Sequence, residues 1–332
     1  MPEWERLTPV QLGSLEDGQQ TRFKMRLGPL RPMWIAEHFD VKDGHAFSDR
    51  MVKGPFGRWD HEHRFDADGA SSKVVDTVEW RLPFHLFSGW TAPITVMPRI
   101  RSMFRFRSDR VRSDLKRIEE TAELPRRRVL VSGSTGLIGT QLCAFLFAAG
   151  HDVVRLLRKE TVLPKHLAKC EVVRWNDRTG EVLEGSFEGF DAVVHLAGAG
   201  IGDKRWSSAR KALLRDSRTG PTRHLATALA AAKQPPEVLL SGSAIGVYGN
   251  RGDEVLTESS TRGFLCDMTN DWEAAALPAK EAGIRLIHLR TGLVTTAAGG
   301  LLGKQLLPAK MGAGGPIRGG RQRLSWISMD DY

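Results

Sequence analysis

The chain has 332 residues, of which 41% are hydrophobic and 26% charged, a composition typical of a soluble globular protein with room for two domains. No apolar run approaches the roughly 20 residues that a membrane-spanning helix needs, and the N-terminus lacks the basic-then-apolar pattern of a secretory signal. Cys143, Cys170 and Cys266 are far apart. Such sparse cysteines favour reduced thiols in a cytoplasmic protein over a disulfide framework.

The formal net charge of +9 is concentrated in one basic stretch. Apolar Ile100, Phe104, Val111, Leu115 and Ile118 recur there at helical spacing, which predicts a long amphipathic helix with one buried stripe. We interpret the charge as a solvated helix face, with an acidic ligand or partner as the alternative. Nucleic-acid binding is not expected, because no aromatic-interleaved basic strand or reading helix accompanies the charge. The basic residues are Arg99, Arg101, Arg105, Arg107, Arg110, Arg112, Lys116 and Arg117.

Before residue 125, strand-like segments alternate with Asp-Gly and Gly-Pro turn signals, and the basic helix closes the region. A run of antiparallel strands followed by a helix is an α+β pattern. We therefore predict an α+β domain over residues 1–120 and a linker over 121–127. The expected strands are residues 34–41, 46–53, 58–66 and 73–81.

From residue 128 onward, strands alternate with helices, which predicts an α/β Rossmann fold with a doubly wound parallel sheet over residues 128–332. The expected strands are residues 129–132, 152–157, 170–175, 191–197, 238–241 and 284–289, and the expected helices are residues 137–149, 209–232 and 272–282.

A glycine-rich turn joins the first of these strands to the first helix. Gly133 permits a sharp turn, Gly136 allows the backbone to approach a pyrophosphate, and Gly139 allows the helix to pack close to the strand. Free N–H groups at the helix N-terminus then suit the phosphates. Because strand, helix and second strand all follow in order, we predict a dinucleotide-binding loop rather than a turn without a ligand. Its residues are Gly133, Ser134, Thr135, Gly136, Leu137, Ile138 and Gly139.

The end of the second strand indicates which dinucleotide is bound. NAD enzymes usually place an acidic residue there for the ribose 2′-hydroxyl, whereas an arginine accommodates a 2′-phosphate. Here the strand ends in Arg158 and Lys159, with Glu160 only after them. We therefore expect NADP(H) in preference to NAD(H), with Arg158 on the 2′-phosphate. The alternative is an exposed basic strand end.

The glycine turn, the segment Val193–Gly198 and the segment Ser241–Gly249 together resemble the extended short-chain dehydrogenase/reductases of the NAD-dependent epimerase/dehydratase type. Arg215–Arg218 and Asp271–Ala276 resemble an atypical subgroup called epimerase family proteins. The resemblance implies a Rossmann fold and NAD(P) binding, but no particular substrate. It also implies further cofactor-site positions after the fourth and sixth strands, namely Leu196, Ala197, Gly198 and Arg290.

The usual family reaction depends on a tyrosine and a lysine four residues later. In this chain Tyr248 is followed four positions on by Gly252, and Tyr332 ends the sequence, so the pair is absent. Ser243 stands where the family has a substrate-orienting serine, and Tyr248 is the internal phenol that remains for proton transfer. We take Ser243 and Tyr248 as candidate catalytic residues, with a strand-end cap and loop packing as their structural alternatives.

These features leave two functions open. The first is an NADP(H)-dependent epimerase-like or oxidoreductase-like enzyme acting on an unidentified small molecule. The second is a non-catalytic protein that binds the nucleotide as a sensing or structural ligand. The missing tyrosine–lysine pair favours the second, while the serine and the intact glycine turn suit both. The sequence leaves the oligomeric state open.

The segments Gly54–Phe65 and Asp76–Pro83, with the basic helix, resemble the START-like superfamily of polyketide cyclases and lipid-transfer proteins. That resemblance implies a helix-grip fold and an apolar ligand. Relatives of this superfamily begin with another strand and helices, and relatives of the reductase type continue beyond residue 332. We therefore expect the first domain to be incomplete at its N-terminus and the second at its C-terminus. Strand alternation places His61 and His63 on one face. No third ligand with suitable spacing is evident in the sequence, so we expect cavity-wall histidines and no metal site.

Overall fold

The computed structural model describes residues 8–11, 14–25, 31–69, 71–83, 94, 96–163, 170–249, 251–258, 264–296, 299–316, 320 and 323–332. No helix in these ranges is long and apolar enough to cross a membrane. The chain forms two compact units, and the main boundary between them lies between Leu115 and Lys116.

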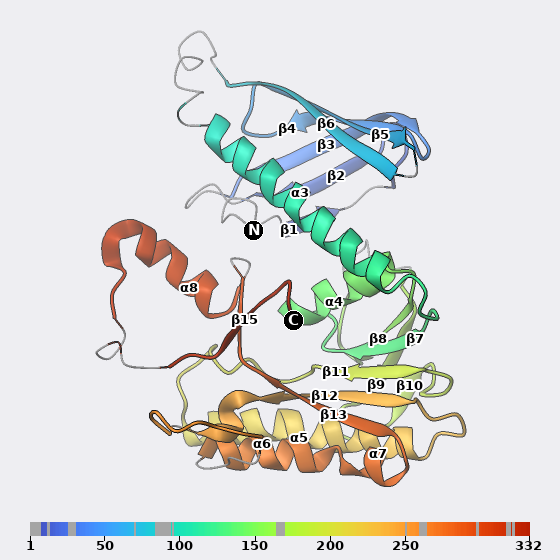
Figure 1. Ribbon diagram of the computed structural model, residues 1–332, viewed down its shortest axis with the longest axis vertical. Coiled ribbons are helices and arrows are strands. Elements are labelled where there is room, and N and C mark those ends of the chain that lie inside the picture. The colour runs from blue at the N-terminus through green and yellow to red at the C-terminus, as the bar shows by residue number, and fades with distance from the viewer. Residues whose placement is uncertain are drawn as a thin grey trace. The chain divides into compact units, whose positions relative to one another are not determined.

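The first unit contains a six-stranded antiparallel sheet in which each strand pairs with the next along the chain (Figure 1). The strands are β1 (Thr8–Gln11), β2 (Gln20–Lys24), β3 (Met33–Lys42), β4 (Ala46–Lys53), β5 (Arg58–Asp68) and β6 (Ser71–Arg81). The four predicted strands correspond to β3–β6. Gly44 and Gly69 have φ values of 70° and 61°, a left-handed conformation that suits glycine in the tight turns of these hairpins.

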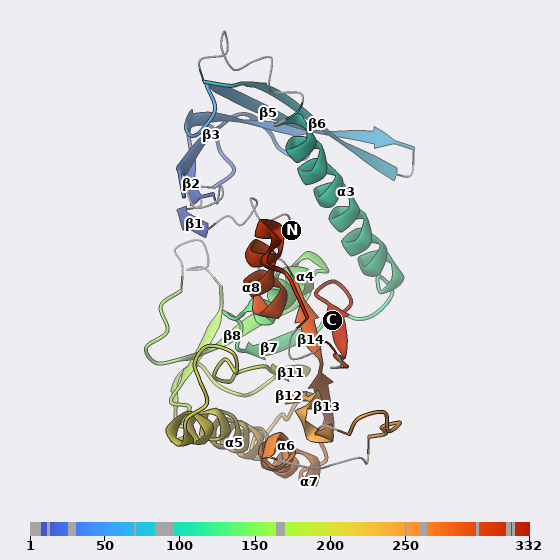
Figure 2. The same ribbon diagram turned by 90° about the vertical axis from the view of Figure 1, so that its left-hand side faces the viewer.

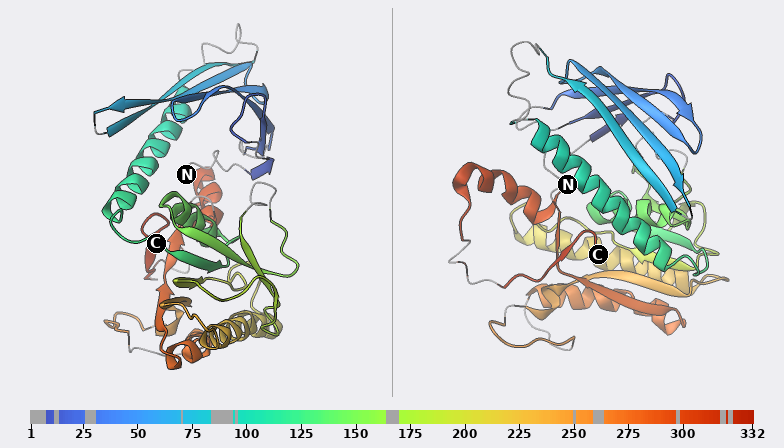
Figure 3. Two further views of the ribbon diagram at one scale, coloured as in Figure 1. Left: turned by 90° about the vertical axis from the view of Figure 1, so that its right-hand side faces the viewer. Right: turned by 45° about the horizontal axis from the view of Figure 1, so that its top comes forward.

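Helix α3 (Met97–Glu120) follows the sheet, and two further views of both are given in Figure 3. Its first turns pack against the sheet, where Ile100 joins Trp34 and Trp59 in a buried cluster. The predicted buried stripe does not extend along the whole helix, because Val111 and Leu115 are 47% and 57% exposed. The aromatic core therefore supports only the N-terminal part of α3.

The second unit is built on a seven-stranded sheet with the order β10-β9-β8-β7-β11-β12-β13. All neighbouring strands are parallel except β10, which pairs antiparallel with β9. The strand order reverses between β7 and β11, which is the switch point where doubly wound sheets bind ligands. The strands are β7 (Arg128–Ser132), β8 (Asp152–Arg158), β9 (Val172–Trp175), β10 (Val182–Glu184), β11 (Ala192–His195), β12 (Val238–Ala244) and β13 (Arg285–Thr291).

Helices cover both faces of this sheet (Figures 1 and 2). Helix α4 (Leu137–Ala148) lies on one face, where Val129 and Val131 of β7 point. The other face carries α5 (Ser208–Ala230), α6 (Phe264–Ala275) and α7 (Leu277–Glu281), with Leu130 of β7 in the core beneath them. This alternation along β7 is what a strand buried on both sides requires.

The predicted helix over residues 272–282 is two helices in the structure. Helix α6 begins earlier, at Phe264, and ends at Ala275; α7 then starts with Pro278 in its first turn. Proline has no N–H to continue the bonding of α6, but it is well suited to the first turn of a new helix.

Shorter elements follow β13 and were not predicted. Strands β14 (Leu293–Thr295) and β15 (Trp326–Ser328) pair in parallel. Between them lie helix α8 (Gly300–Pro308) and the single turn η5 (Ala309–Ala313).

Candidate functional site

The glycine turn lies at the switch point of the second sheet. Gly133 has a φ of 67°, and a Cβ atom built on it would lie 2.8 Å from the carbonyl carbon of Leu196 in the loop after β11. A Cβ atom on Gly139 would lie 2.3 Å from the Gly133 oxygen. Both positions therefore need glycine: one because of its backbone conformation and its neighbour, the other because helix α4 packs directly on the turn.

The N-terminus of α4 has the features of an anion site. Its cap, Gly136, provides no side-chain hydrogen bond, and no acidic residue lies in the first turn. Thr135 and Leu137 are exposed, and the N–H groups of the first helical turn have no partner within an α-helix. The Gly136 N–H, in contrast, donates to the Gly133 carbonyl at 2.9 Å. Ser134 is 1% exposed, yet its hydroxyl has no hydrogen-bond partner in the described part of the chain. The turn thus offers unused donors together with a helix dipole, and these residues fit a pyrophosphate.

The second strand contributes two arginines with different positions. Arg158 ends β8 with an exposed side chain, as expected for a residue available to a ligand. Arg155 lies on the same strand, is 6% exposed and donates a hydrogen bond of 2.6 Å to the Ser134 carbonyl. Sequence reasoning missed Arg155, which stabilises the glycine turn through this hydrogen bond. An arginine inside an otherwise apolar strand is the signal that could have identified it.

The loop after β11 lies beside the glycine turn. Leu196, Ala197 and Gly198 follow β11, and the Leu196 N–H donates to the Ser132 carbonyl at 3.3 Å. Arg218 of α5 supports this loop by donating to the Ala199 carbonyl at 2.9 Å. The structure therefore brings Gly133 and the Leu196–Gly198 segment together, as the sequence predicts.

Ser243, Tyr248 and Arg290 also come together, through a residue that was not predicted. Ser243, on β12, donates a hydrogen bond of 2.5 Å to Glu273 of α6. Both oxygens of Glu273 accept hydrogen bonds of 2.9 Å from Arg290, on β13. The Arg290 guanidinium lies 3.5 Å from the hydroxyl of Tyr248, in the 3₁₀ turn η4 (Ile245–Tyr248), and 5.6 Å from its ring centre. We call Ser243, Tyr248, Glu273 and Arg290 the polar network.

The electrostatics of the polar network keep Glu273 ionised. Burial alone would raise the pKa of Glu273, but hydrogen bonds from Arg290 and Ser243 outweigh burial, so the pKa is lowered. The same carboxylate raises the pKa of Arg290. Because ionised Glu273 can only accept hydrogen bonds, the Ser243 hydroxyl is the donor in this pair. The lone pairs of the Ser243 oxygen then remain to accept a hydrogen bond, for example from a hydroxyl group.

The histidine of the fourth strand, His195, is 1% exposed. Its Nδ1 lies 2.6 Å from the Ser132 hydroxyl and its Nε2 lies 3.0 Å from that of Thr222. Burial lowers the pKa of His195 to about 4. It is therefore a neutral, hydrogen-bonded core residue at neutral pH.

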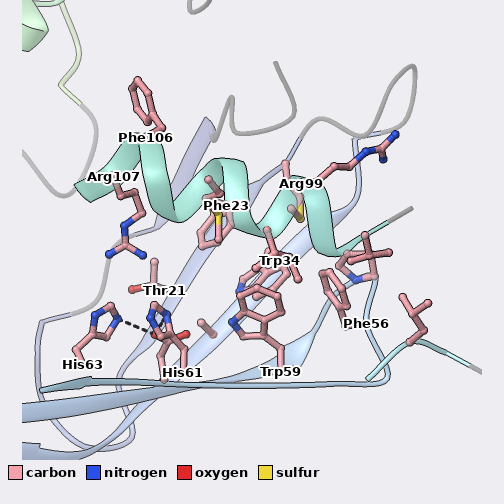
Figure 4. A pocket seen from close by; sticks show the side chains of 18 of the residues that line it. Thr21, Phe23, Trp34, Phe56, Trp59, His61, His63, Arg99, Phe106 and Arg107 are labelled. Atoms are coloured by element: carbon pink, nitrogen blue, oxygen red, sulfur yellow. Dashed lines mark ion pairs between the residues drawn. The ribbon is translucent and has the colours of Figure 1, made fainter. Parts of the chain in front are cut away.

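The first unit contains a cavity of about 620 Å³ between its sheet and α3. Trp34, Phe56 and Trp59 line one end of it, while His61, His63 and Arg107 gather at the other (Figure 4). The side chains of His61 and His63 point inward and are buried, as the strand alternation predicts. The cavity therefore combines an apolar body with one polar end.

Two carboxylates that sequence spacing did not reveal lie beside these histidines. Asp49 of β4 lies opposite His61 across the hairpin, and Asp76 of β6 lies opposite His63. Burial lowers the pKa of His61, and neighbouring His63 lowers it further despite the two carboxylates. The two carboxylates could be identified only from the strand register, because the pairing of β4, β5 and β6 brings them beside the histidines.

The doubly wound sheet and the glycine turn at its switch point define a Rossmann-like fold. Residues 129–277 match the NAD dependent epimerase/dehydratase family. Over 205 residues the chain is 42% identical to an epimerase family protein of Mycobacterium bovis, covering 61% of this chain and 65% of that protein. Over 210 residues it is 36% identical to an epimerase family protein of Bos taurus, covering 61% of this chain and 67% of that protein.

Two crystal structures are also similar. A nucleoside-diphosphate sugar epimerase from Corynebacterium glutamicum is 31% identical with a TM-score of 0.76, covering 99% of this chain and 67% of that one. The human epimerase family protein SDR39U1, solved with NADPH, is 32% identical with a TM-score of 0.54, covering 61% of this chain and 66% of that one. The chain therefore belongs to the NAD dependent epimerase/dehydratase family. It spans 65% of the length of the Mycobacterium bovis relative, slightly less than two thirds.

Proposed function

We propose that the second unit binds NADP(H) at the glycine turn. The observation that carries this proposal is the N-terminus of α4 at the sheet's switch point, where no side chain caps the helix. Beside it lies the buried hydroxyl of Ser134, which has no hydrogen-bond partner among the described residues. The backbone from Gly133 to Gly139 would hold the pyrophosphate, and exposed Arg158 would pair with the 2′-phosphate. The human relative solved with NADPH supports this choice of cofactor.

The remaining predicted positions take roles along the same edge of the sheet. Leu196, Ala197 and Gly198 would lie along the adenosine side, because their loop contacts Gly133. Ser132, His195 and Ser241 are paired across β7, β11 and β12, and Ser132 directly precedes the glycine turn. Ser243 lies two residues further along β12, where it pairs with Arg290 of β13. The polar network would therefore lie toward the nicotinamide end.

The second unit would act as an epimerase-like or oxidoreductase-like enzyme on a small molecule that carries a hydroxyl or carbonyl group. A bound nicotinamide supplies a hydride donor or acceptor. Ser243, which donates to Glu273, would orient a substrate hydroxyl by accepting its hydrogen bond. The phenol of Tyr248, beside the Arg290 cation, would give or take the proton that the absent tyrosine–lysine pair handles in relatives.

A nucleotide titration tests the cofactor proposal. Nicotinamide fluorescence should show tighter binding of NADPH than of NADH to the whole chain. Gly136→Val should abolish binding of both nucleotides, because its side chain would enter the phosphate path. Arg158→Ala should weaken NADPH about tenfold or more while leaving NADH unchanged, since about 1.4 kcal/mol of lost ion pairing corresponds to that factor. Equal binding of both nucleotides by the wild type would contradict the assignment of Arg158.

The alternative function is a nucleotide sensor without turnover, and the absence of the tyrosine–lysine pair favours it. Oxidation of NADPH in the presence of panels of carbonyl compounds separates the two functions. An enzyme should consume the cofactor and lose activity in Tyr248→Phe. A sensor should bind NADPH with no consumption in either protein.

For the first unit, we propose a START-like helix-grip domain that takes an apolar ligand into its cavity. The antiparallel sheet, helix α3 and the aromatic lining support this assignment. Ala36, which lines the cavity and is 5% exposed, offers a test. Ala36→Phe should fill the space and abolish binding of an apolar fluorescent dye. Unchanged dye binding in that variant would refute the proposal.

A further inference from the structure

Four titratable side chains lie together on three neighbouring strands of the first unit. Strand β5 carries His61 and His63, flanked by Asp49 of β4 and Asp76 of β6. Both histidines are less than 10% exposed, and their ring centres lie 3.8 Å apart. Such a concentration of lone pairs in a largely apolar cavity is costly unless a cation or a set of donors satisfies it.

The spacing around Asp49 fits a metal ion better than direct hydrogen bonds. One carboxylate oxygen of Asp49 lies 3.6 Å from His61 Nδ1 and 3.5 Å from His63 Nε2. These separations are longer than the usual 2.7–3.2 Å of a hydrogen bond to nitrogen. Ligands about 2.0–2.1 Å from a tetrahedral zinc ion lie roughly 3.3 Å from one another. One ligand atom from each of Asp49, His61 and His63 falls within 4.8 Å of the other two.

Asp76 directs both imidazoles toward Asp49. His61 Nε2 hydrogen-bonds one Asp76 oxygen at 3.1 Å, and His63 Nδ1 lies 2.8 Å from the same oxygen. These contacts are shorter than those to Asp49, at 3.6 and 3.5 Å, so they favour an N–H on the nitrogen of each ring that faces Asp76. The unprotonated nitrogen of each ring then faces Asp49. Carboxylates that hold metal-binding histidines in this way are a recurrent feature of zinc sites.

The cluster opens onto the cavity on one side. Asp49, His61 and His63 all line it, together with Arg107 of α3, as Figure 4 shows for the two histidines and the arginine. Further coordination positions would therefore face the cavity and be open to a bound molecule. Three protein ligands with open positions are typical of metal sites that bind or activate a ligand, rather than of closed structural sites.

We propose that Asp49, His61 and His63 bind a divalent first-row transition metal ion of the Zn²⁺ type, with Asp76 as the residue that positions both imidazoles. Two imidazoles and one carboxylate are a donor set that suits Zn²⁺ and Fe²⁺. This site lies in the first unit, so it is independent of the cofactor proposed for the second.

The test is calorimetric titration of the whole chain with Zn²⁺ after removal of metals by a chelator. The wild type should bind one ion tightly and gain thermal stability. His63→Gln and Asp49→Asn should each lower the affinity at least about 100-fold, and Asp76→Asn about 10–100-fold, the range reported for such supporting residues. His45→Gln, at an exposed histidine in the turn between β3 and β4, is the control and should bind as the wild type does.

Two results would overturn the metal site. One is absence of a tight Zn²⁺ site in the folded wild type. The other is unchanged affinity in folded His63→Gln and Asp49→Asn, which would assign the ion to surface histidines. If these variants do not fold, X-ray absorption of the wild type loaded with one equivalent of Zn²⁺ decides. Two imidazole ligands, with oxygen ligands completing the coordination shell, support the site, and any other number of imidazoles refutes it.

Discussion

Glu273 organises the polar groups at the carboxyl ends of β12 and β13. Its carboxylate accepts from Ser243 and twice from Arg290. Sequence reasoning identified Ser243, Tyr248 and Arg290 but passed over Glu273, because a glutamate at the start of the predicted helix 272–282 is usually solvated. Only the packing of α6 against β12 places this side chain beside Ser243.

Replacing Glu273 should therefore lower the stability of the folded chain. Glu273→Gln removes the charge that pairs with partly buried Arg290, and we expect the free energy of unfolding to fall by about 1–3 kcal/mol. Denaturant unfolding would measure this. Glu281→Gln, at an exposed glutamate of α7, should change the value by less than about 0.5 kcal/mol. Equal effects of the two variants would show that the polar network contributes nothing to stability.

His195 should make the protein sensitive to mild acid. Its pKa in the folded chain is about 4, below the ordinary value of 6.5, because burial disfavours the charged form. Above pH 6.5 both states are neutral and His195 has no effect on the pH dependence. Between pH 6.5 and 4 the unfolded chain binds a proton that the folded chain excludes, so stability falls as the pH falls. We expect this to cost about 2 kcal/mol between pH 7.5 and 5.

Comparison with His195→Asn isolates this contribution, since the other titrating groups are common to both proteins. Denaturant unfolding at pH 7.5 and 5 should show a smaller pH-dependent loss in the variant by about 2 kcal/mol. His45→Asn, at an exposed position, should lose as much as the wild type. Parallel losses in wild type and His195→Asn would mean that the histidine is protonated in the fold.

At the scale of elements, α4 depends on close contact with the turn that precedes it. Gly139→Ala would bring a Cβ atom to 2.3 Å from the Gly133 oxygen. Because the obstacle is backbone, we expect a loss of about 1–3 kcal/mol in unfolding free energy and weaker nucleotide binding. Gly202→Ala is the control, as its Cβ atom would meet only the flexible end of Lys304 at 3.6 Å. A Gly139→Ala protein as stable as Gly202→Ala would contradict this packing.

Element prediction succeeded where the periodicity was local. Strands β3–β6, the start of β7 and helix α4 follow from alternation, turn residues and apolar spacing. It failed where tertiary context decides. Helix α6 begins at Phe264, eight residues before the start of the predicted helix. Strand β10 is a short antiparallel edge strand, and its position depends on pairing with β9. Val111 and Leu115 of α3 are exposed, which likewise shows that an apolar stripe at helical spacing does not by itself predict burial.

At the scale of the whole chain, the sequence predicts the order of α+β and α/β regions and the location of the glycine turn. It could not predict which side chains meet across strands. Asp49 and His61 pair only because β4 and β5 are in register, and Ser243 meets Glu273 only because α6 covers the end of β12. The sites of both units therefore depend on contacts between residues that are distant along the chain.

A crystal structure of the whole chain grown with NADPH tests the central claim most directly. We predict the pyrophosphate on the unpaired N–H groups of the glycine turn and the first turn of α4, the 2′-phosphate within hydrogen-bond distance of Arg158, and the nicotinamide beside Ser243. A dinucleotide bound away from the N-terminus of α4, or a nicotinamide remote from Ser243 and Tyr248, would contradict the account.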